Sequence, residues 1–149
     1  MRKLRELSRE LGAEIVYFNV EESNMIFDNQ LESDVEGLYV PELKIIYIRD
    51  DLTLLEQENV LLHELGHCHY GHTHYSCHAK MYSSKQEAEA NYYMVAYRFS
   101  DWLLTWDFAP HPNEVKVEQF MNAYDLSKNM RWICEQIIDE YSEEYSEAI

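Results

Sequence analysis

The sequence predicts an α+β fold in which a small antiparallel sheet with a hairpin packs on a mostly helical body. Only four glycines and three prolines interrupt the 149 residues, which favours long helices over many short strands. The β-rich runs lie in the first third of the chain, and long helical patterns follow them. With no internal repeat and no linker-like stretch, residues 1–149 are expected to form one domain.

The first third of the chain predicts one helix, one strand and one hairpin. Leucines at helical spacing predict a helix over residues 2–11, which Gly12 ends. The run EIVYFNV at 14–20 is rich in β-formers and predicts a strand. Residues 37–48 contain two β-rich runs around Pro41, and this pattern is typical of a hairpin.

The remaining two thirds are predicted to be helical. Leucines among acidic residues indicate a helix that Asp51 or Thr53 caps and that Gly71 ends. The elements expected after it are a long helix over 86–106, a proline-containing break at 108–114, a short helix to Tyr124 and a final helix after a turn at 125–127.

The composition excludes one class of partner. Hydrophobic residues make up 46% and charged residues 27%, which is the balance of a soluble globular protein. The formal net charge is -16, and so acidic a surface repels phosphate backbones. We therefore expect no direct binding of nucleic acid, whereas a basic protein partner is compatible with this charge.

The N-terminus and the cysteines indicate a compartment. MRKLRELSREL alternates charged residues with leucine and has no continuous apolar core, so a signal peptide is not expected. No apolar run approaches the length that spans a membrane. The three cysteines, Cys68, Cys77 and Cys134, give an odd count without a pairing pattern. We expect a reduced, cytoplasmic protein with no membrane partner.

Residues His63 to His67 read HELGH, an HExxH motif within a predicted helix. Residues four apart lie on one helix face, so both imidazoles can reach one ion. Glu64 can contact a metal-bound water without being a ligand and can act as the general base. A pair of hydrogen-bonded core histidines would leave Glu64 unexplained, because a buried carboxylate is costly without a cation or a partner. The motif therefore predicts a zinc site with Glu64 as its catalytic residue.

A catalytic zinc needs a third protein ligand. The metzincin pattern of a third histidine fails, because Gly71 comes one residue late and position 73 is Thr73. The other source is a carboxylate from the following helix, as in gluzincin-type peptidases, and Glu87 and Glu89 begin that helix. Two residues apart on a helix, they point to roughly opposite faces, so only one can face the metal. The spacing does not decide which.

The chain resembles a known family at these motifs. VLLHELGH at 60–67, followed by EAEAN at 87–91, is similar to the ImmA/IrrE family of zinc-dependent peptidases, whose members carry HELGH and then a helix that opens with an E-A-N element. The order of helix, strand and G-x-Y hairpin before the motif is similar too. The likeness is strongest over residues 1–105 and weaker in the C-terminal helices at 113–149.

The resemblance implies a set of site residues. The metal ligands would be His63, His67 and Glu89, with Glu64 as general base and Glu87 as the alternative third ligand. It also implies that the helical body is a gluzincin-like metallopeptidase body. The implied cofactor is Zn2+, and Mn2+ is the alternative, because two histidines and a carboxylate can hold either ion.

The other histidines after the motif are expected to form a polar loop at the rim of the cleft rather than to bind metal: His69, His72, His74 and His78. A sharper hypothesis makes His72 or His74 the donor to the oxyanion of the tetrahedral intermediate. Tyr92 and Tyr93 compete for that role, because they follow the start of the ligand helix.

These observations lead to one main functional hypothesis, a zinc-dependent endopeptidase that cleaves a cytoplasmic protein. The resemblance implies that the substrate is a DNA-binding transcriptional repressor of a mobile element, such as a phage, or of a stress response. The alternative is a non-proteolytic antirepressor that binds and sequesters a regulator, with the metal in a structural role. A peptidase with an unrelated protein substrate is a third hypothesis.

The hairpin at 37–48 carries a hypothesis of its own. An edge strand beside a zinc cleft can hold an extended peptide by backbone pairing. Proline at Ile46 or Ile48 is then expected to weaken cleavage more than folding.

Overall fold

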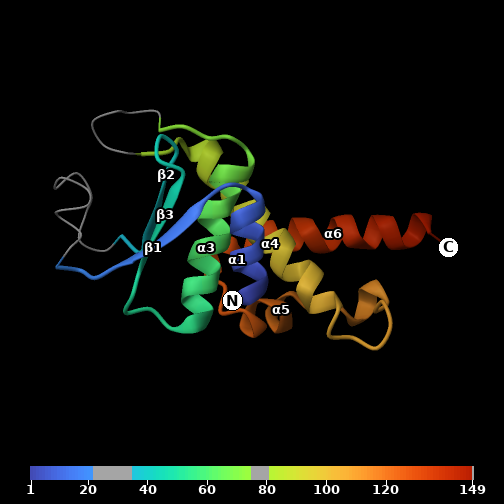
Figure 1. The fold of residues 1–149 in the computed structure, drawn as a ribbon. Coiled ribbons are helices and arrows are strands. Elements are labelled where there is room, and N and C mark those ends of the chain that lie inside the picture. Colours follow the sequence, from blue (N-terminus) through green and yellow to red (C-terminus); the bar gives the residue numbers. More distant parts are fainter. Residues whose placement is uncertain (22–34, 75–80, 149) are drawn as a thin grey trace. The chain divides into compact units, whose positions relative to one another are not determined.

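The computed structural model describes residues 1–21, 35–74 and 81–148 (Figure 1). These residues form two compact units, Met1–Ala90 and Asn91–Ile149, and the boundary between the units falls within helix α4 (Ser84–Leu103). The expectation of one domain over residues 1–149 stays a prediction.

The first unit combines helices with one small sheet, which confirms the α+β fold class. Its elements in chain order are α1 (Arg2–Glu10), β1 (Glu14–Phe18), β2 (Gly37–Val40), β3 (Ile45–Arg49), α3 (Leu54–His69) and the first turns of α4. The helix predicted over 2–11 is α1. Gly12 follows it with a φ of 77°, a left-handed conformation that glycine adopts without steric cost.

The sheet is mixed rather than antiparallel. Its strand order is β1-β3-β2, with β2 antiparallel to β3 as the predicted hairpin. Strand β1 runs parallel to β3, in a register from Glu14 opposite Ile45 to Phe18 opposite Arg49. The prediction of an all-antiparallel sheet is therefore wrong for β1. A parallel pair needs a connection of about a dozen residues or more, and the stretch from Phe18 to Ile45 is long enough to provide it.

The central position of β3 overturns a second expectation. Ile46 and Ile48 lie on this middle strand with 0% of their surface exposed. Proline at either position would remove ladder hydrogen bonds from the core of the sheet and would unfold it before affecting any substrate. In this sheet the edge strands are β1 and β2.

Helix α3 packs on the sheet and carries the HELGH motif. Figure 1 shows the helix beside β2 and β3, and both strands contact it. Leu61, Leu62 and Leu65 of this helix are fully buried. The helix begins with a capping box, in which the Thr53 hydroxyl accepts from the backbone N–H of Glu56 and the Glu56 side chain accepts from that of Thr53. The cap predicted at Thr53 is thus confirmed.

Gly37 lets β2 approach α3 closely. A Cβ atom at this position would lie 2.4 Å from Cγ1 of Val60 and 2.9 Å from the backbone oxygen of Tyr47. Both distances are far below van der Waals contact. The missing side chain therefore sets the spacing between the edge strand and the motif helix.

The second unit is helical and has an aromatic core. Its elements are the remainder of α4, η1 (Pro112–Glu114), α5 (Val117–Ala123), η2 (Lys128–Met130) and α6 (Arg131–Glu147). Phe120 is fully buried, and its ring lies 5.3 Å from that of Phe99 and 5.4 Å from that of Trp102, between ring centroids. The long helix predicted over 86–106 is α4, and the final helix is α6.

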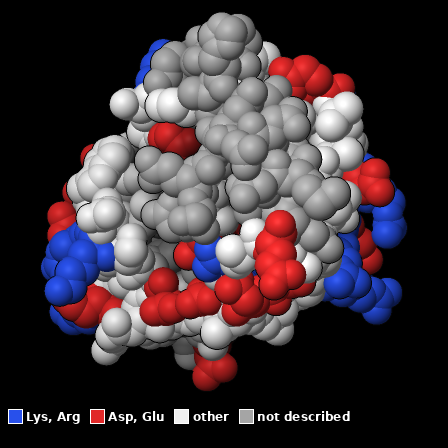
Figure 2. Space-filling view, turned by 90° about the vertical axis from the view of Figure 1, so that its left-hand side faces the viewer, with Lys and Arg blue, Asp and Glu red and all other residues white. Residues whose placement is uncertain are grey.

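The surface reflects the acidic composition. On the face drawn in Figure 2, Asp and Glu side chains cover more of the coloured surface than Lys and Arg do, as expected from a net charge of -16. Among the residues that the structure describes, no helix combines the length and apolarity that crossing a membrane requires.

Candidate metal centre

The two motif histidines lie next to each other on α3. His63 and His67 are one helical turn apart, and their ring centroids are 4.9 Å from each other. His67 is fully buried, whereas the His63 side chain is 19% exposed. One ring of the pair therefore lies in the core and the other at its border.

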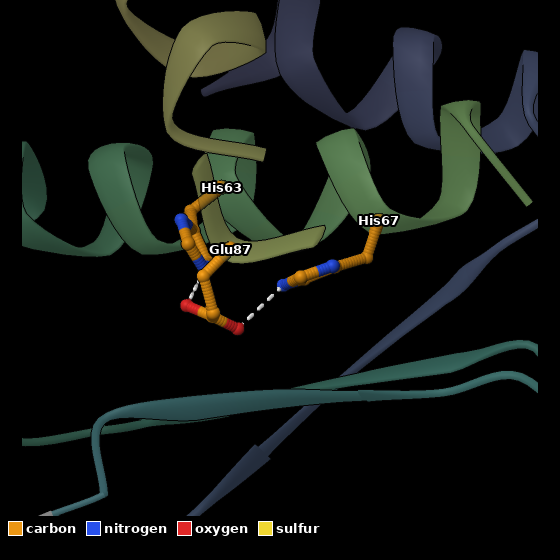
Figure 3. Close-up of side chains that lie close together, drawn as sticks. All are labelled: His63, His67 and Glu87. Carbon is orange, nitrogen blue, oxygen red and sulfur yellow. Dashed lines mark hydrogen bonds and ion pairs between the residues drawn. The ribbon is translucent and has the colours of Figure 1, made fainter. Parts of the chain in front are cut away.

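Glu87 of α4 completes a cluster with these histidines (Figure 3). Its two carboxylate oxygens lie 3.1 Å from Nε2 of His63 and 3.0 Å from Nε2 of His67. The three ligand atoms are all within 4.8 Å of one another. Two imidazoles and a carboxylate are the donor set of a catalytic zinc site, and they also suit manganese.

The start of α4 is fixed by hydrogen bonds that place Glu87 in the first turn. The Ser83 hydroxyl accepts from the backbone N–H of Gln86, and the Gln86 side-chain oxygen accepts from that of Ser83. The Gln86 amide also donates to the backbone oxygen of Thr73 at 3.0 Å. These contacts set the rotation of the helix start, and thereby decide which acidic side chain faces the histidines.

Glu89 lies in a different place from Glu87. Its Oε1 atom is 3.7 Å from Nε2 of His72, and Glu89 does not belong to the cluster of three ligand atoms. The two glutamates thus occupy different faces of α4, as their spacing predicts. The assignment of Glu89 as third ligand stays a prediction, while the cluster contains the alternative, Glu87.

Glu64 lies beside the cluster with its carboxylate buried. Only 6% of the residue is exposed, and its Oε2 accepts from the backbone N–H of Tyr39 on β2 at 2.8 Å. Burial, together with the negative charge of Glu87, raises the pKa of Glu64 to about 7, against the opposing effects of His63 and of the Tyr39 N–H. A carboxyl group with such a pKa can exchange a proton near neutral pH.

The outer edge of β2 at Tyr39 is occupied by side chains of the site. Besides the bond from its N–H to Glu64, its backbone oxygen accepts from the Tyr82 hydroxyl at 2.8 Å and lies 3.2 Å from Nε2 of His74. A peptide pairing with β2 at this point has to replace these hydrogen bonds.

Tyr82 is a site residue that sequence reasoning missed. Its ring stacks on that of His67, with centroids 3.6 Å apart and an angle of 9° between the planes. The residue is buried, and burial raises the pKa of its hydroxyl above the ordinary value. The only signal in the sequence was the position of an aromatic residue directly before the ligand helix.

The charges in the cluster depend on one another. Burial lowers the pKa of His67 to about 4, so its imidazole is neutral at physiological pH. Burial alone would raise the pKa of Glu87, but hydrogen bonds from His63 and His67 outweigh that effect and hold it well below its usual range. Neutral imidazoles and an ionised carboxylate are the forms that bind a divalent cation.

The four candidates for oxyanion stabilisation lie in different surroundings. His72 is buried, with its Nδ1 atom 3.0 Å from Nδ1 of His67, whereas His74 approaches the Tyr39 oxygen. Tyr92 donates its hydroxyl hydrogen to Glu140 at 2.6 Å, and Tyr93 is half-buried on α4. Of the other histidines expected in the loop, His69 is instead the exposed last residue of α3, and His78 lies outside the described residues.

Comparison with known proteins identifies the family. A family model described as IrrE N-terminal-like domain, Peptidase_M78, matches residues 9–128, which is more than half of the chain. No curated protein and no solved structure gave a significant match. The match confirms the resemblance to the ImmA/IrrE family that HELGH and EAEAN suggested. The chain belongs to the Peptidase_M78 family of peptidases with an IrrE N-terminal-like domain.

Proposed function

We propose that this protein is a zinc-dependent endopeptidase of gluzincin-like design that acts in the cytoplasm on a DNA-binding transcriptional repressor. One observation carries the peptidase proposal: His63, His67 and Glu87 converge on one point, with the buried Glu64 beside them. A purely structural ion site favours four protein ligands and has no use for a neighbouring carboxylate such as Glu64. Membership of a peptidase family supports the same conclusion.

The residues fit a zinc ion. Zinc bonds of about 2.1 Å in a tetrahedral arrangement separate neighbouring ligand atoms by about 3.4 Å. Each imidazole nitrogen lies 3.0 or 3.1 Å from a different oxygen of Glu87. One ligand atom from each of the three residues lies within 4.8 Å of the others, so small side-chain movements bring them to that separation. We therefore assign His63, His67 and Glu87 as the ligands, with Mn2+ as the alternative ion. When bound, the metal supplies Lewis-acid polarisation of the scissile carbonyl.

Glu64 handles the proton of the reaction. As general base it accepts a proton from the attacking water, and as general acid it passes that proton to the leaving amine. Its pKa of about 7 suits both transfers near neutral pH. The Tyr39 N–H holds the carboxylate in place for this work.

His74 and Tyr82 are suited to stabilise the oxyanion. Both already approach a carbonyl oxygen, that of Tyr39, at 3.2 and 2.8 Å. Hydrogen-bond donors arranged around a carbonyl are what the tetrahedral intermediate of peptide hydrolysis requires. Of the four residues that the sequence suggested for this role, His74 is the one we retain.

The repressor as substrate rests on the family and on the charge. The resemblance to ImmA/IrrE proteins connects such peptidases with repressors of mobile elements and stress genes. A net charge of -16 favours association with a basic DNA-binding protein.

Co-expression with the regulator encoded next to the gene tests both parts of the proposal. The intact mass of that regulator is measured after co-expression with the wild type and with Glu64→Gln. Fragments that form only with the wild type support a site-specific peptidase. An intact regulator that co-purifies with both forms would instead support the antirepressor that sequesters its target. An intact regulator without a complex would mean that this regulator is the wrong partner or that cleavage needs an activating signal.

A further inference from the structure

The C-terminal end of α3 places His72 against a metal ligand. The backbone N–H of Gly71 donates to the oxygen of Cys68 at 3.1 Å, and that of His72 donates to the oxygen of His67 at 2.9 Å. With Gly71 at a φ of 66°, this pattern is a Schellman motif. The turn reverses the chain so that the His72 side chain returns to the ring of His67.

The two rings share one hydrogen bond. Nδ1 of His67 lies 3.0 Å from Nδ1 of His72, and His72 is only 8% exposed. On its far side, Nε2 of His72 lies 3.7 Å from Oε1 of Glu89. His67, His72 and Glu89 therefore form a series, in which a hydrogen bond joins the first two residues and the last two lie within ion-pair distance.

The direction of the hydrogen bond between His67 and His72 follows from proton counting. A neutral imidazole carries one ring proton, and a nitrogen that binds a metal carries none. If Nε2 of His67 is the metal ligand, its proton is on Nδ1 and is donated to Nδ1 of His72. The proton of His72 is then on Nε2, on the side of Glu89. Metal-bound histidines in proteins commonly donate their second N–H in this way, which fixes the ring and makes it a better ligand.

We propose that His72 is a positioning residue for the metal ligand His67, and that Glu89 orients His72 in turn. This inference rests on the proposed metal centre. Under this proposal the two glutamates of EAEAN have different roles. Glu87 binds the metal, and Glu89 contacts His72. The proposal also replaces the hypothesis that His72 donates to the oxyanion with a role in supporting the metal ligand His67.

The first experiment measures Zn2+ affinity of the full chain by competition with a chelator. His72→Ala is expected to weaken affinity 10- to 100-fold, on the order found when such supporting partners are removed. His72→Gln keeps a hydrogen-bond acceptor for His67 and should restore part of the loss, and Glu89→Gln should lose less than His72→Ala. The control is His69→Ala, an exposed histidine near the same helix end, which should bind as the wild type does.

The Glu87→Gln variant distinguishes a failure of the His72 proposal from a failure of the proposed metal centre. If the wild type binds Zn2+ and Glu87→Gln does not, while His72→Ala binds as tightly as the wild type, the metal centre stands and the role of His72 is refuted. If Glu87→Gln binds Zn2+ unchanged, the proposed ligand set itself fails.

A second measurement uses only the wild-type protein, so misfolding of a variant cannot affect its result. In the ¹⁵N NMR spectrum of the Zn2+-loaded wild type, His67 should carry metal on Nε2 and a slowly exchanging proton on Nδ1, coupled to Nδ1 of His72. If His72 had only a structural role, this tautomer of His67 would not be required. Metal on Nδ1 of His67, or the shared proton on His72, would overturn the proposal.

Discussion

The two compact units bury different kinds of side chain. The buried polar residues of the first unit, among those described, are Ser8, Glu64, His67 and His72, and three of these four belong to the metal centre or touch it. In the second unit the core is built from apolar and aromatic side chains, and Arg98 is the buried charged residue among those described. Burying polar groups costs free energy unless hydrogen bonds or ions satisfy them. In the first unit the buried polar groups gather at the candidate metal centre, whereas the core of the second unit is mainly apolar and aromatic.

The largest effect expected from this comparison is on catalysis in the first unit. Glu64→Gln removes the proposed general base but keeps an oxygen that can accept from the Tyr39 N–H. General acid–base catalysis contributes about 10²- to 10⁴-fold, so cleavage of the substrate should fall by about three orders of magnitude. Zn2+ affinity and thermal stability should stay close to those of the wild type. Retained cleavage by this variant would remove Glu64 from the mechanism.

The second unit should respond in the opposite way. Phe120→Ala leaves a cavity between the rings of Phe99 and Trp102, and truncating a fully buried phenylalanine costs about 3–5 kcal/mol of unfolding free energy. Zn2+ affinity should not change, because no ligand and no residue of the His72 series belongs to this unit. Urea unfolding and chelator competition measure the two quantities.

The matched control for that variant is Trp132→Ala, an aromatic residue on α6 that is 59% exposed. Its unfolding free energy should change by no more than about 0.5 kcal/mol. If Phe120→Ala weakened Zn2+ binding in the folded protein, the functional separation of the two units would be wrong.

A smaller effect is expected where the sheet meets the motif helix. Gly37→Ala adds a Cβ atom that collides with Val60 and with the backbone of Tyr47, and overpacking of this kind costs about 1–3 kcal/mol. Cleavage should also fall, because Tyr39 on the same strand holds Glu64. Adding Val60→Ala should recover part of the stability, since it removes one of the two collisions. A Gly37→Ala variant as stable as the wild type would mean that strand and helix are not held at this spacing.

The helices and the HELGH pair could be predicted from the sequence because their signals are local. Thr53 and Gly71 mark the start and end of α3, and four-residue spacing places His63 and His67 on one face. The parallel pairing of β1 could not be predicted, because alternation along a strand says nothing of the direction of its neighbour.

The third ligand shows where local reasoning ends. Helix geometry predicts that Glu87 and Glu89 face different ways, and the structure agrees. Which one meets the histidines depends on the rotation of α4, and that rotation is set by the contact of Gln86 with Thr73, outside the helix itself. Tyr82 was missed for a related reason, since only the fold brings its ring onto His67.

The smallest effect is expected at the start of α3, the helix that carries the proposed ligands His63 and His67. Thr53→Ala removes the hydroxyl that accepts from the N–H of Glu56, and loss of such a cap costs about 1 kcal/mol. Thr53→Ser keeps the hydroxyl, so its unfolding free energy should stay within about a few tenths of a kcal/mol of the wild-type value. Urea unfolding measures both variants. Zn2+ affinity should be unchanged in both, because the contacts of α3 with β2 and β3 also hold this helix. A loss of affinity in Thr53→Ala alone would mean that the capping box, and not the packing on β2 and β3, holds the ligands in place.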